Sequence, residues 1–378
     1  MTMPRDSVAR ALLLPLICAS LLFGCAEMPE QKDAPKVALV FPPPPDEPRF
    51  YFEQSIYGSH NVVQSEDSAL KTMLTGEAAG SEGLAKPYAV AVHKGRIFVS
   101  DSAETTIKVF DPPAKKFFKI GEEEPGALRK PLGLDVDGAG NLYVADASAK
   151  AVLIYDRDGR FLRRIGSSKW FDRLTSVTVD TAGARIYVTD IGGVDSQNHR
   201  IRVFDAVKGD HLMDIGKRGG GGGEFNLPRD MAIGKDGRLY VADGGNFRVQ
   251  IFDKDGKFLK SFGKVGKTPG TFARPKEVAT DAEGNVYVVD TAFGNFQIFS
   301  PEGDLLMFVG DRSERDGPGK YMLPSGIFVD EDGRVYMVDQ WFRKIDVFRP
   351  AQLPAGEGFL AKGTGEPAPK ATEPAAKK

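Results

Sequence analysis

The chain has 378 residues, with 50 Lys and Arg against 52 Asp and Glu, so its formal net charge is −2. This balance gives no general attraction to nucleic acid or anionic lipid, and the sequence has no basic block of the kind that such partners need. Two cysteines exclude a disulfide framework, and four histidines leave little for a histidine-rich metal site. The 43 Gly and 25 Pro predict a chain with many turns.

The N-terminus has the features of an export signal. Arg5 and Arg10 precede an apolar run at 11–23, whose 13 residues are too few to span a hydrocarbon core of about 30 Å as a helix. The run ends in Leu22-Phe23-Gly24-Cys25, which resembles the lipobox of bacterial lipoproteins. The resemblance implies that residues 1–24 are a signal peptide and that Cys25 carries the lipid. A plain secretory signal and a buried anchor stay open as alternatives.

The residue after this cysteine bears on the choice of membrane. Ala26 stands there, whereas the sorting rule of bacterial lipoproteins reserves Asp for retention in the inner membrane. The resemblance therefore implies a protein of the bacterial cell envelope, anchored through lipid on Cys25 to the outer membrane and facing the periplasm. Cys18 lies in the signal peptide, so the mature chain keeps a single, lipidated cysteine, which excludes disulfides and thiol catalysis.

Segments of biased composition flank the body of the chain. Residues 25–48 are rich in proline and are expected to form a disordered, semi-rigid spacer. Residues 351–378 are rich in Pro, Ala, Gly and Lys and are expected to form a disordered tail. Between the spacer and the repeats described next, residues 65–76 place apolar side chains on one helical face and predict a short helix.

One pattern recurs six times in the body. Each copy contains an apolar strand that ends in Asp, and the six strands read IFVSD (97–101), LYVAD (142–146), IYVTD (186–190), LYVAD (239–243), VYVVD (286–290) and VYMVD (335–339). In five copies the next strand closes on an aromatic residue nine positions after the Asp, whereas the third copy needs fourteen. Alternating apolar and polar residues between Asp-Gly turns are typical of half-buried antiparallel strands.

A repeat of about 45 residues with four strands predicts one blade of a β-propeller. Residues 228–253, with PRDMAI, LYVADGGN and VQIFD, resemble the NHL repeat, whose family forms six-bladed propellers. We therefore expect an all-β fold, a six-bladed β-propeller of four-stranded antiparallel blades over residues 49–350. The last copy has three convincing strands, so an N-terminal strand at about 49–56 is expected to join the last blade and close the ring.

Binding residues are expected on the loop-bearing face, where the chain enters the first strand of each blade and turns from the second strand to the third. The repeat places eleven candidates for a partner-binding rim there: Arg229, Asp230, Phe247, Arg248, Lys276, Glu277, Phe293, Asn295, Trp341, Phe342 and Arg343. Aromatic side chains with interleaved Arg are typical of interface hot spots. Packing of these aromatics against neighbouring blades stays open as an alternative, as does a neutral role for the insertion at 192–199.

Acidic residues of the repeat are interpreted as structural. The six Asp residues at the strand ends are expected to accept backbone N–H bonds and to stabilise the turns that follow, rather than to hold a cation. Residues 135–138 (DVDG) and 330–333 (DEDG) are read as hairpin turns. They lack the twelve-residue spacing and the terminal bidentate Glu of a calcium-binding loop.

Enzymatic activity is the alternative function. Some six-bladed relatives are lyases or lactonases that use a metal in the channel, and such sites need two or three converging His or carboxylate ligands. The four histidines occupy unrelated positions of the repeat, which departs from the ligand set of the amidating-lyase relatives: His60, His93, His199 and His211. The sequence has no nucleophile elbow, P-loop or dinucleotide fingerprint. We therefore expect no catalytic residue, metal or cofactor.

The sequence favours a lipid-anchored binding or scaffold module. Its loop-bearing face is expected to hold a protein, a peptide or an envelope polymer, with a metal-dependent lyase or lactonase as the alternative. A nucleic-acid partner is not expected, because the relatives that bind RNA do so through a strongly basic face, whereas this chain is slightly acidic.

Overall fold

The computed structural model describes residues 39–63, 81–193 and 195–360. Cys25, the expected signal peptide and the helix expected at 65–76 lie outside these residues. The described residues are almost all in strands and turns, with two three-residue 3₁₀ helices, η1 (Ser59–Asn61) and η2 (Gly244–Asn246). No helix among them is long and apolar enough to cross a membrane.

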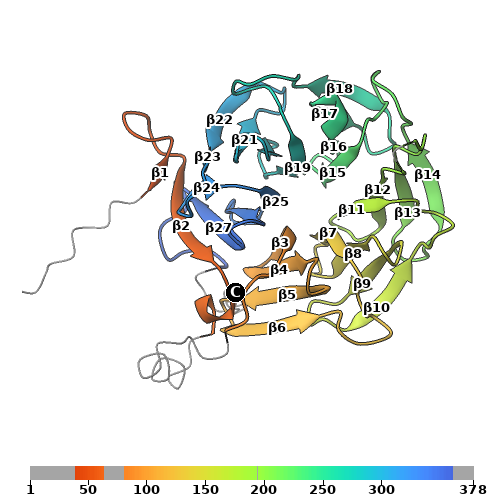
Figure 1. The fold of residues 1–378 in the computed structure, drawn as a ribbon, viewed down its shortest axis with the longest axis horizontal. Coiled ribbons are helices and arrows are strands. Elements are labelled where there is room, and N and C mark those ends of the chain that lie inside the picture. The colour runs from red at the N-terminus through yellow and green to blue at the C-terminus, as the bar shows by residue number, and fades with distance from the viewer. Residues whose placement is uncertain (1–38, 64–80, 194, 361–378) are drawn as a thin grey trace, which may run out of the picture. The chain divides into compact units, whose positions relative to one another are not determined.

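Six antiparallel sheets form a ring of blades around a channel, which confirms the expected six-bladed propeller (Figure 1). The first strand of each blade contacts the first strands of its neighbours, so these strands line the channel. Blades 1 and 2 contain β3 (Pro87–His93), β4 (Arg96–Asp101), β5 (Thr106–Asp111), β6 (Lys116–Ile120), β7 (Pro131–Val136), β8 (Leu142–Asp146), β9 (Ala151–Tyr155) and β10 (Phe161–Ile165).

The next three blades repeat this arrangement. They contain β11 (Leu174–Val179), β12 (Arg185–Asp190), β13 (Arg200–Asp205), β14 (His211–Ile215), β15 (Pro228–Ile233), β16 (Leu239–Asp243), β17 (Arg248–Phe252), β18 (Phe258–Phe262), β19 (Pro275–Thr280), β20 (Val286–Asp290), β21 (Asn295–Phe299) and β22 (Leu305–Val309). A short parallel pair, β23 (Asp311–Arg312) and β24 (Lys320–Tyr321), lies in the loop between blades 5 and 6.

Blade 6 joins the two ends of the propeller. Its sheet has the order β1 (Val40–Phe41), β2 (Phe50–Ile56), β27 (Lys344–Pro350), β26 (Val335–Asp339) and β25 (Pro324–Val329). The register of β2 on β27 runs from Phe50 opposite Pro350 to Ile56 opposite Ile345. The closure expected from an N-terminal strand at about 49–56 is therefore confirmed. Strand β1 adds a fifth, two-residue strand from within the segment that was expected as a spacer.

The hydrophobic core is divided among the spaces between blades. Alternation along each strand gives every blade two apolar faces, so each face is buried by the blade beside it. Ile56 of β2 packs in the cluster shared by blades 6 and 1, and Phe50 packs in the cluster between blades 5 and 6. The described chain continues to Leu360, ten residues into the expected tail, and Leu360 is buried in the first of these clusters.

Candidate binding site at the channel mouth

The Asp residue that ends the second strand fixes the entry into the channel-lining strand. Asp101 accepts backbone N–H bonds from Ala85 at 2.7 Å and Lys86 at 3.0 Å, just before β3. It also accepts N–H bonds from Ala103 and Glu104 in the turn after β4. Asp146, Asp290 and Asp339 make the same pair of contacts in their blades. The expected structural role is confirmed, and it includes the entry loop as well as the turn.

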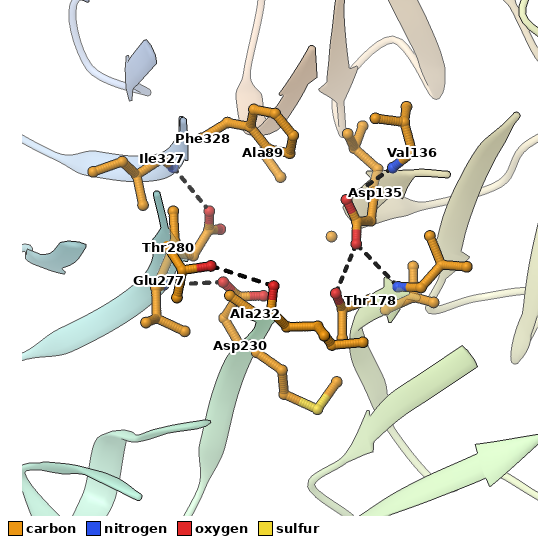
Figure 2. A pocket seen from close by; sticks show the side chains of 18 of the residues that line it. Ala89, Asp135, Val136, Thr178, Asp230, Ala232, Glu277, Thr280, Ile327 and Phe328 are labelled. Atoms are coloured by element: carbon orange, nitrogen blue, oxygen red, sulfur yellow. Dashed lines mark hydrogen bonds between the residues drawn. The ribbon is translucent and has the colours of Figure 1, made fainter. Parts of the chain in front are cut away.

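Asp135 does not belong to the turn in which the sequence placed it. The turn is made by Asp137, which accepts the N–H groups of Ala139 and Asn141, whereas Asp135 lies within β7 and lines the channel. Its Oδ2 accepts hydrogen bonds from Thr178 Oγ1 at 2.6 Å and from Val179 N at 3.0 Å on the neighbouring blade (Figure 2). The carboxylate therefore links β7 to β11.

Two more carboxylates line the same channel cavity of about 200 Å³ (Figure 2). Asp230 of β15 accepts a hydrogen bond from Ser176 Oγ at 2.5 Å and another from Val278 N at 3.0 Å. Glu277 of β19 accepts the Ile327 N–H of β25 at 3.2 Å. Each carboxylate thus receives a backbone N–H from the next blade, which fits a role in holding the inner strands together.

Burial disfavours the charged form of these three carboxyl groups. It raises the pKa values of Asp135 and Asp230 to about 6, although their hydrogen bonds act in the opposite direction. Burial raises the pKa of Glu277 well above its ordinary value, and the negative charge of Asp230 adds to the rise. The channel therefore holds carboxyl groups that take up protons at higher pH than the unfolded chain does.

We expect Glu277→Gln to raise the melting temperature at pH 8 and to change it little at pH 4. A pKa that is higher in the folded than in the unfolded state makes the free energy of unfolding fall as the pH rises above the unfolded value, by about 1.4 kcal/mol per pH unit until the folded pKa is reached. Glutamine keeps an acceptor for the Ile327 N–H but has no charge. Thermal unfolding of both proteins across this pH range measures the difference.

Glu224→Gln is the matched control, with the opposite sign. The Gly221 N–H donates to its carboxylate at 2.9 Å, and this hydrogen bond lowers the pKa of Glu224. Its charge therefore stabilises the folded state above the unfolded pKa, and this stability is lost as the pH falls. Glu224→Gln should melt lower than the wild type at pH 8. If Glu277→Gln also lowered the melting temperature at pH 8, our account of the channel carboxyls would be wrong.

A second cavity, of about 450 Å³, opens where the chain enters the channel-lining strands. Five cationic side chains line it, together with Tyr88, Thr175, Gln340, two leucines and small residues of two turns. The five are Lys86, Lys130, Arg173, Arg229 and Lys276. Tyr88 lies against Lys276, whose Nζ is 4.3 Å from the centroid of the ring. We call this cavity the channel mouth.

The expected rim residues of β15 and β19 line two different cavities. Arg229 and Lys276 line the channel mouth, whereas the next residues along the chain, Asp230 and Glu277, line the deeper cavity. Arg248 is drawn away from the mouth, because its Nε lies 2.9 Å from Asp243 Oδ2 and its terminal nitrogen donates to the carbonyl groups of Gly221 and Glu224.

The remaining rim candidates differ in exposure. Phe247 packs against the cluster between blades 4 and 5, as the packing alternative required, and Asn295 is buried. Phe293 and Phe342 are half-buried, and Arg343 is exposed. Trp341 is 61% exposed and directly follows Gln340 of the channel mouth. Of the four candidate aromatics, Trp341 presents the largest free surface.

The described residues of the insertion at 192–199 contact the loop that leads into the next blade. His199 is buried, and its Nδ1 accepts the Leu227 N–H at 3.1 Å in the loop that enters β15. Arg218 donates to the carbonyl group of Ser196 at 3.1 Å. These contacts explain the extra residues as a brace between blades 3 and 4.

The histidines do not form a metal centre. His60 contacts Ser81, His93 contacts Glu331 and His211 contacts Asp214, all at separate places in the propeller. Across residues 39–63, 81–193 and 195–360, no three His, Cys, Asp or Glu side chains are grouped so that they could hold a metal ion. The residues present therefore do not fit the metal that the lyase relatives would imply.

Sequence reasoning missed Lys86, Lys130 and Arg173, which line the channel mouth, and Tyr88 beside them. A signal was available, because each of the three cations stands directly before the first strand of its blade. Arg274 takes the same position before β19. The equivalent positions before β15 and β25 carry Leu227 and Leu323.

Comparison with known proteins supports the reading of the repeat. Residues 225–252, which span most of blade 4, match the family model of the NHL repeat. The chain is a six-bladed β-propeller that contains an NHL repeat. The match covers β15, β16 and β17, the elements that carry Arg229 of the channel mouth and Asp243 at its strand end.

The curated relatives that match parts of this propeller have diverse names. The chain is 48% identical over 54 residues to "Protein lin-41" of Caenorhabditis elegans, which is 14% of this chain and 5% of that protein. It is 30% identical over 171 residues to "Peptidyl-glycine alpha-amidating monooxygenase B" of Xenopus laevis, which is 42% of this chain and 19% of that protein. It is 33% identical over 85 residues to "NHL repeat-containing protein 3" of Mus musculus, which is 22% of this chain and 23% of that protein. The matches thus span less than a quarter of each of these relatives.

Solved structures share the fold at low sequence identity. A gluconolactonase of Xanthomonas campestris aligns with a TM-score of 0.54 and 14% identity, covering 71% of this chain and 86% of its own. A streptogramin B lyase aligns with a TM-score of 0.52 and 13% identity, and the alignment covers 70% of this chain and 94% of the lyase chain. At this identity the likeness shows the propeller fold alone.

Proposed function

We propose that this NHL-repeat propeller is a non-catalytic binding module, anchored to the cell envelope through lipid on Cys25, that holds a protein, a peptide or an envelope polymer on its loop-bearing face. The observation that carries the proposal is the channel mouth, a cavity of about 450 Å³ whose lining includes Gln340, the residue directly before the exposed Trp341. A concave site of this size beside an exposed aromatic side chain is typical of a binding surface.

The rigidity of the scaffold supports the same function. Each entry loop is held by an Asp of its own blade, and the inner strands are held to one another by Asp135, Asp230 and Glu277. Binding to a preformed surface costs less conformational entropy than binding to a mobile one. An anchor on Cys25 and a proline-rich segment before the propeller would present this face to partners at a distance from the membrane.

We expect Trp341→Ala to reduce capture of the partner in intact cells at least tenfold, while the melting temperature stays within about 2 °C. The side chain is exposed, so its truncation removes little packing of the folded protein. Capture is measured by crosslinking in cells and quantitative mass spectrometry of the proteins and polymers recovered. Leu259→Ala is the control, because Leu259 is 45% exposed but lies on the outer strand β18. Equal capture by the Trp341→Ala protein and the wild type would contradict the proposal.

A further inference from the structure

Cationic side chains converge on the channel mouth from five of the six blades. Lys86, Lys130, Arg173 and Arg274 each directly precede the first strand of blades 1, 2, 3 and 5. Arg229 and Lys276 are the second residues of β15 and β19. The ring symmetry brings these positions together around the channel axis, although the residues are spread over the chain from 86 to 276. We call these six residues the cationic ring.

The side chains of the cationic ring have no direct anionic partner among the described residues. Within residues 39–63, 81–193 and 195–360, none of its six side chains forms a salt bridge or a side-chain hydrogen bond, and the lining of the channel mouth includes no acidic residue. The buried Lys and Arg side chains elsewhere in the described propeller are all paired with carboxylates. Lys344 Nζ lies 3.0 Å from Asp346, and Lys108 Nζ lies 2.8 Å from Glu104.

The cations of the ring also repel one another, as expected for positive charges without direct anionic partners. Burial lowers the pKa of Arg229, and the positive charges of Arg173 and Arg274 lower it further. Burial lowers the pKa of Lys276 to about 8; the charge of Glu277 acts against this shift, whereas Arg229 and Arg274 act in the same direction as burial. Glu277 lies next to Lys276 in the sequence but lines the deeper cavity, and burial raises its own pKa.

We propose that the channel mouth binds a compact, multiply charged anion, with clustered phosphate or carboxylate groups, against the cationic ring. The inference rests on the proposed function and names the chemical group through which the channel mouth would hold that partner. The cavity of about 450 Å³ has the volume of a small-molecule site. Arg and Lys side chains recognise phosphate and carboxylate oxygens through charge-assisted hydrogen bonds. Tyr88 and Gln340 line the same cavity and carry further hydrogen-bond donors in their hydroxyl and amide groups.

Calorimetry with the purified mature protein tests this assignment. Tripolyphosphate and citrate are the probes for the phosphate and carboxylate sources, titrated at low and at physiological salt. We expect one or both to bind in the micromolar range, to raise the melting temperature, and to bind more weakly as the salt concentration rises. Arg229→Gln should weaken binding roughly tenfold or more, because a charge-assisted hydrogen bond is lost. Arg229→Lys should recover part of the affinity.

Lys257→Gln is the matched control, since Lys257 is exposed in the turn between β17 and β18, away from the channel mouth. It removes the same charge and should leave the affinity within twofold. Without ligand, the Arg229→Gln protein should melt no lower than the wild type, because it loses one of several repelling charges. A residue with a purely structural role would instead lower the melting temperature when replaced.

Three results would overturn the inference. The first is the absence of binding of both probes at millimolar concentration. The second is an equal loss of affinity in the Arg229→Gln and Lys257→Gln proteins. The third is tighter binding of a single-stranded RNA oligonucleotide than of tripolyphosphate, which would assign the ring to a nucleic acid. The proposed function fails on a separate result, namely capture that does not depend on Trp341, so the two failures are distinguishable.

Discussion

A chain that begins at residue 57 is expected to lose cooperative unfolding, whereas a chain that begins at residue 39 should melt close to the full chain. The shorter chain lacks β2, which pairs with β27 along its whole length. Without it, β27 becomes an open edge, and Phe348 loses its ring contacts with Phe41 and Phe52. Replacing a buried Phe by Ala alone costs about 3–5 kcal/mol, and here a whole strand is removed.

Calorimetry and size-exclusion chromatography measure this effect. We expect the chain from residue 57 to show no sharp heat-absorption peak and to form aggregates through its exposed edge strand. A synthetic peptide that covers residues 39–58, added in excess, should restore part of the transition by mass action. A melting temperature of the shorter chain equal to that of the chain from residue 39 would show that closure by β2 contributes little.

Arg334→Met is expected to destabilise the protein by about 3–5 kcal/mol, because it breaks a buried ion-pair network. The Arg334 side chain is 0% exposed, and its Nε lies 2.7 Å from Glu53 Oε2 of β2. It also contacts the Asp332 carboxylate at 3.0 Å and donates to the Glu357 carbonyl at 2.6 Å. Methionine fills much of the volume but leaves two carboxylates and one carbonyl group without their cation.

Arg238→Met supplies the matched control, since Arg238 holds the same position of the repeat in blade 4. Its Nε lies 2.9 Å from Asp236, but the two side chains are 40% and 47% exposed. Exposed ion pairs contribute about 0–1 kcal/mol. Urea unfolding of the two variants should therefore separate them by at least about 2 kcal/mol. Similar losses in both would mean that the Arg334 network does not secure the closing strand.

Much of the fold could be predicted because the repeat determines local structure. The strand LYVAD at 142–146 coincides with β8, and IYVTD at 186–190 forms all but the first residue of β12. The closing strand was expected at about 49–56 and is observed as Phe50–Ile56. Alternation of apolar residues and Asp-Gly turns acts over a few residues, so it can be read from a single sequence.

The candidate site could be predicted in part. Glu277 was expected on the rim, but the strand register shifts between Pro275 and Val278, and Glu277 lines the channel instead. A shift of one residue exchanges the two faces of a strand, and no alternation pattern reports it. Lys86 and Arg274 are 188 positions apart, so their charges form no local run. Such a cluster becomes visible when the blades are superposed on one another.

Closure through β2 also has a consequence for how the molecule is made. Tyr51 lies opposite Arg349 in the finished sheet, so one of the first segments of the propeller to leave a ribosome pairs with one of the last. Contacts between such distant segments form late, because the intervening chain must first be ordered. Blades 1 to 5 can assemble as the chain emerges, but the circle stays open until synthesis has passed residue 350. A nascent chain arrested earlier therefore presents an unpaired strand to the quality-control machinery.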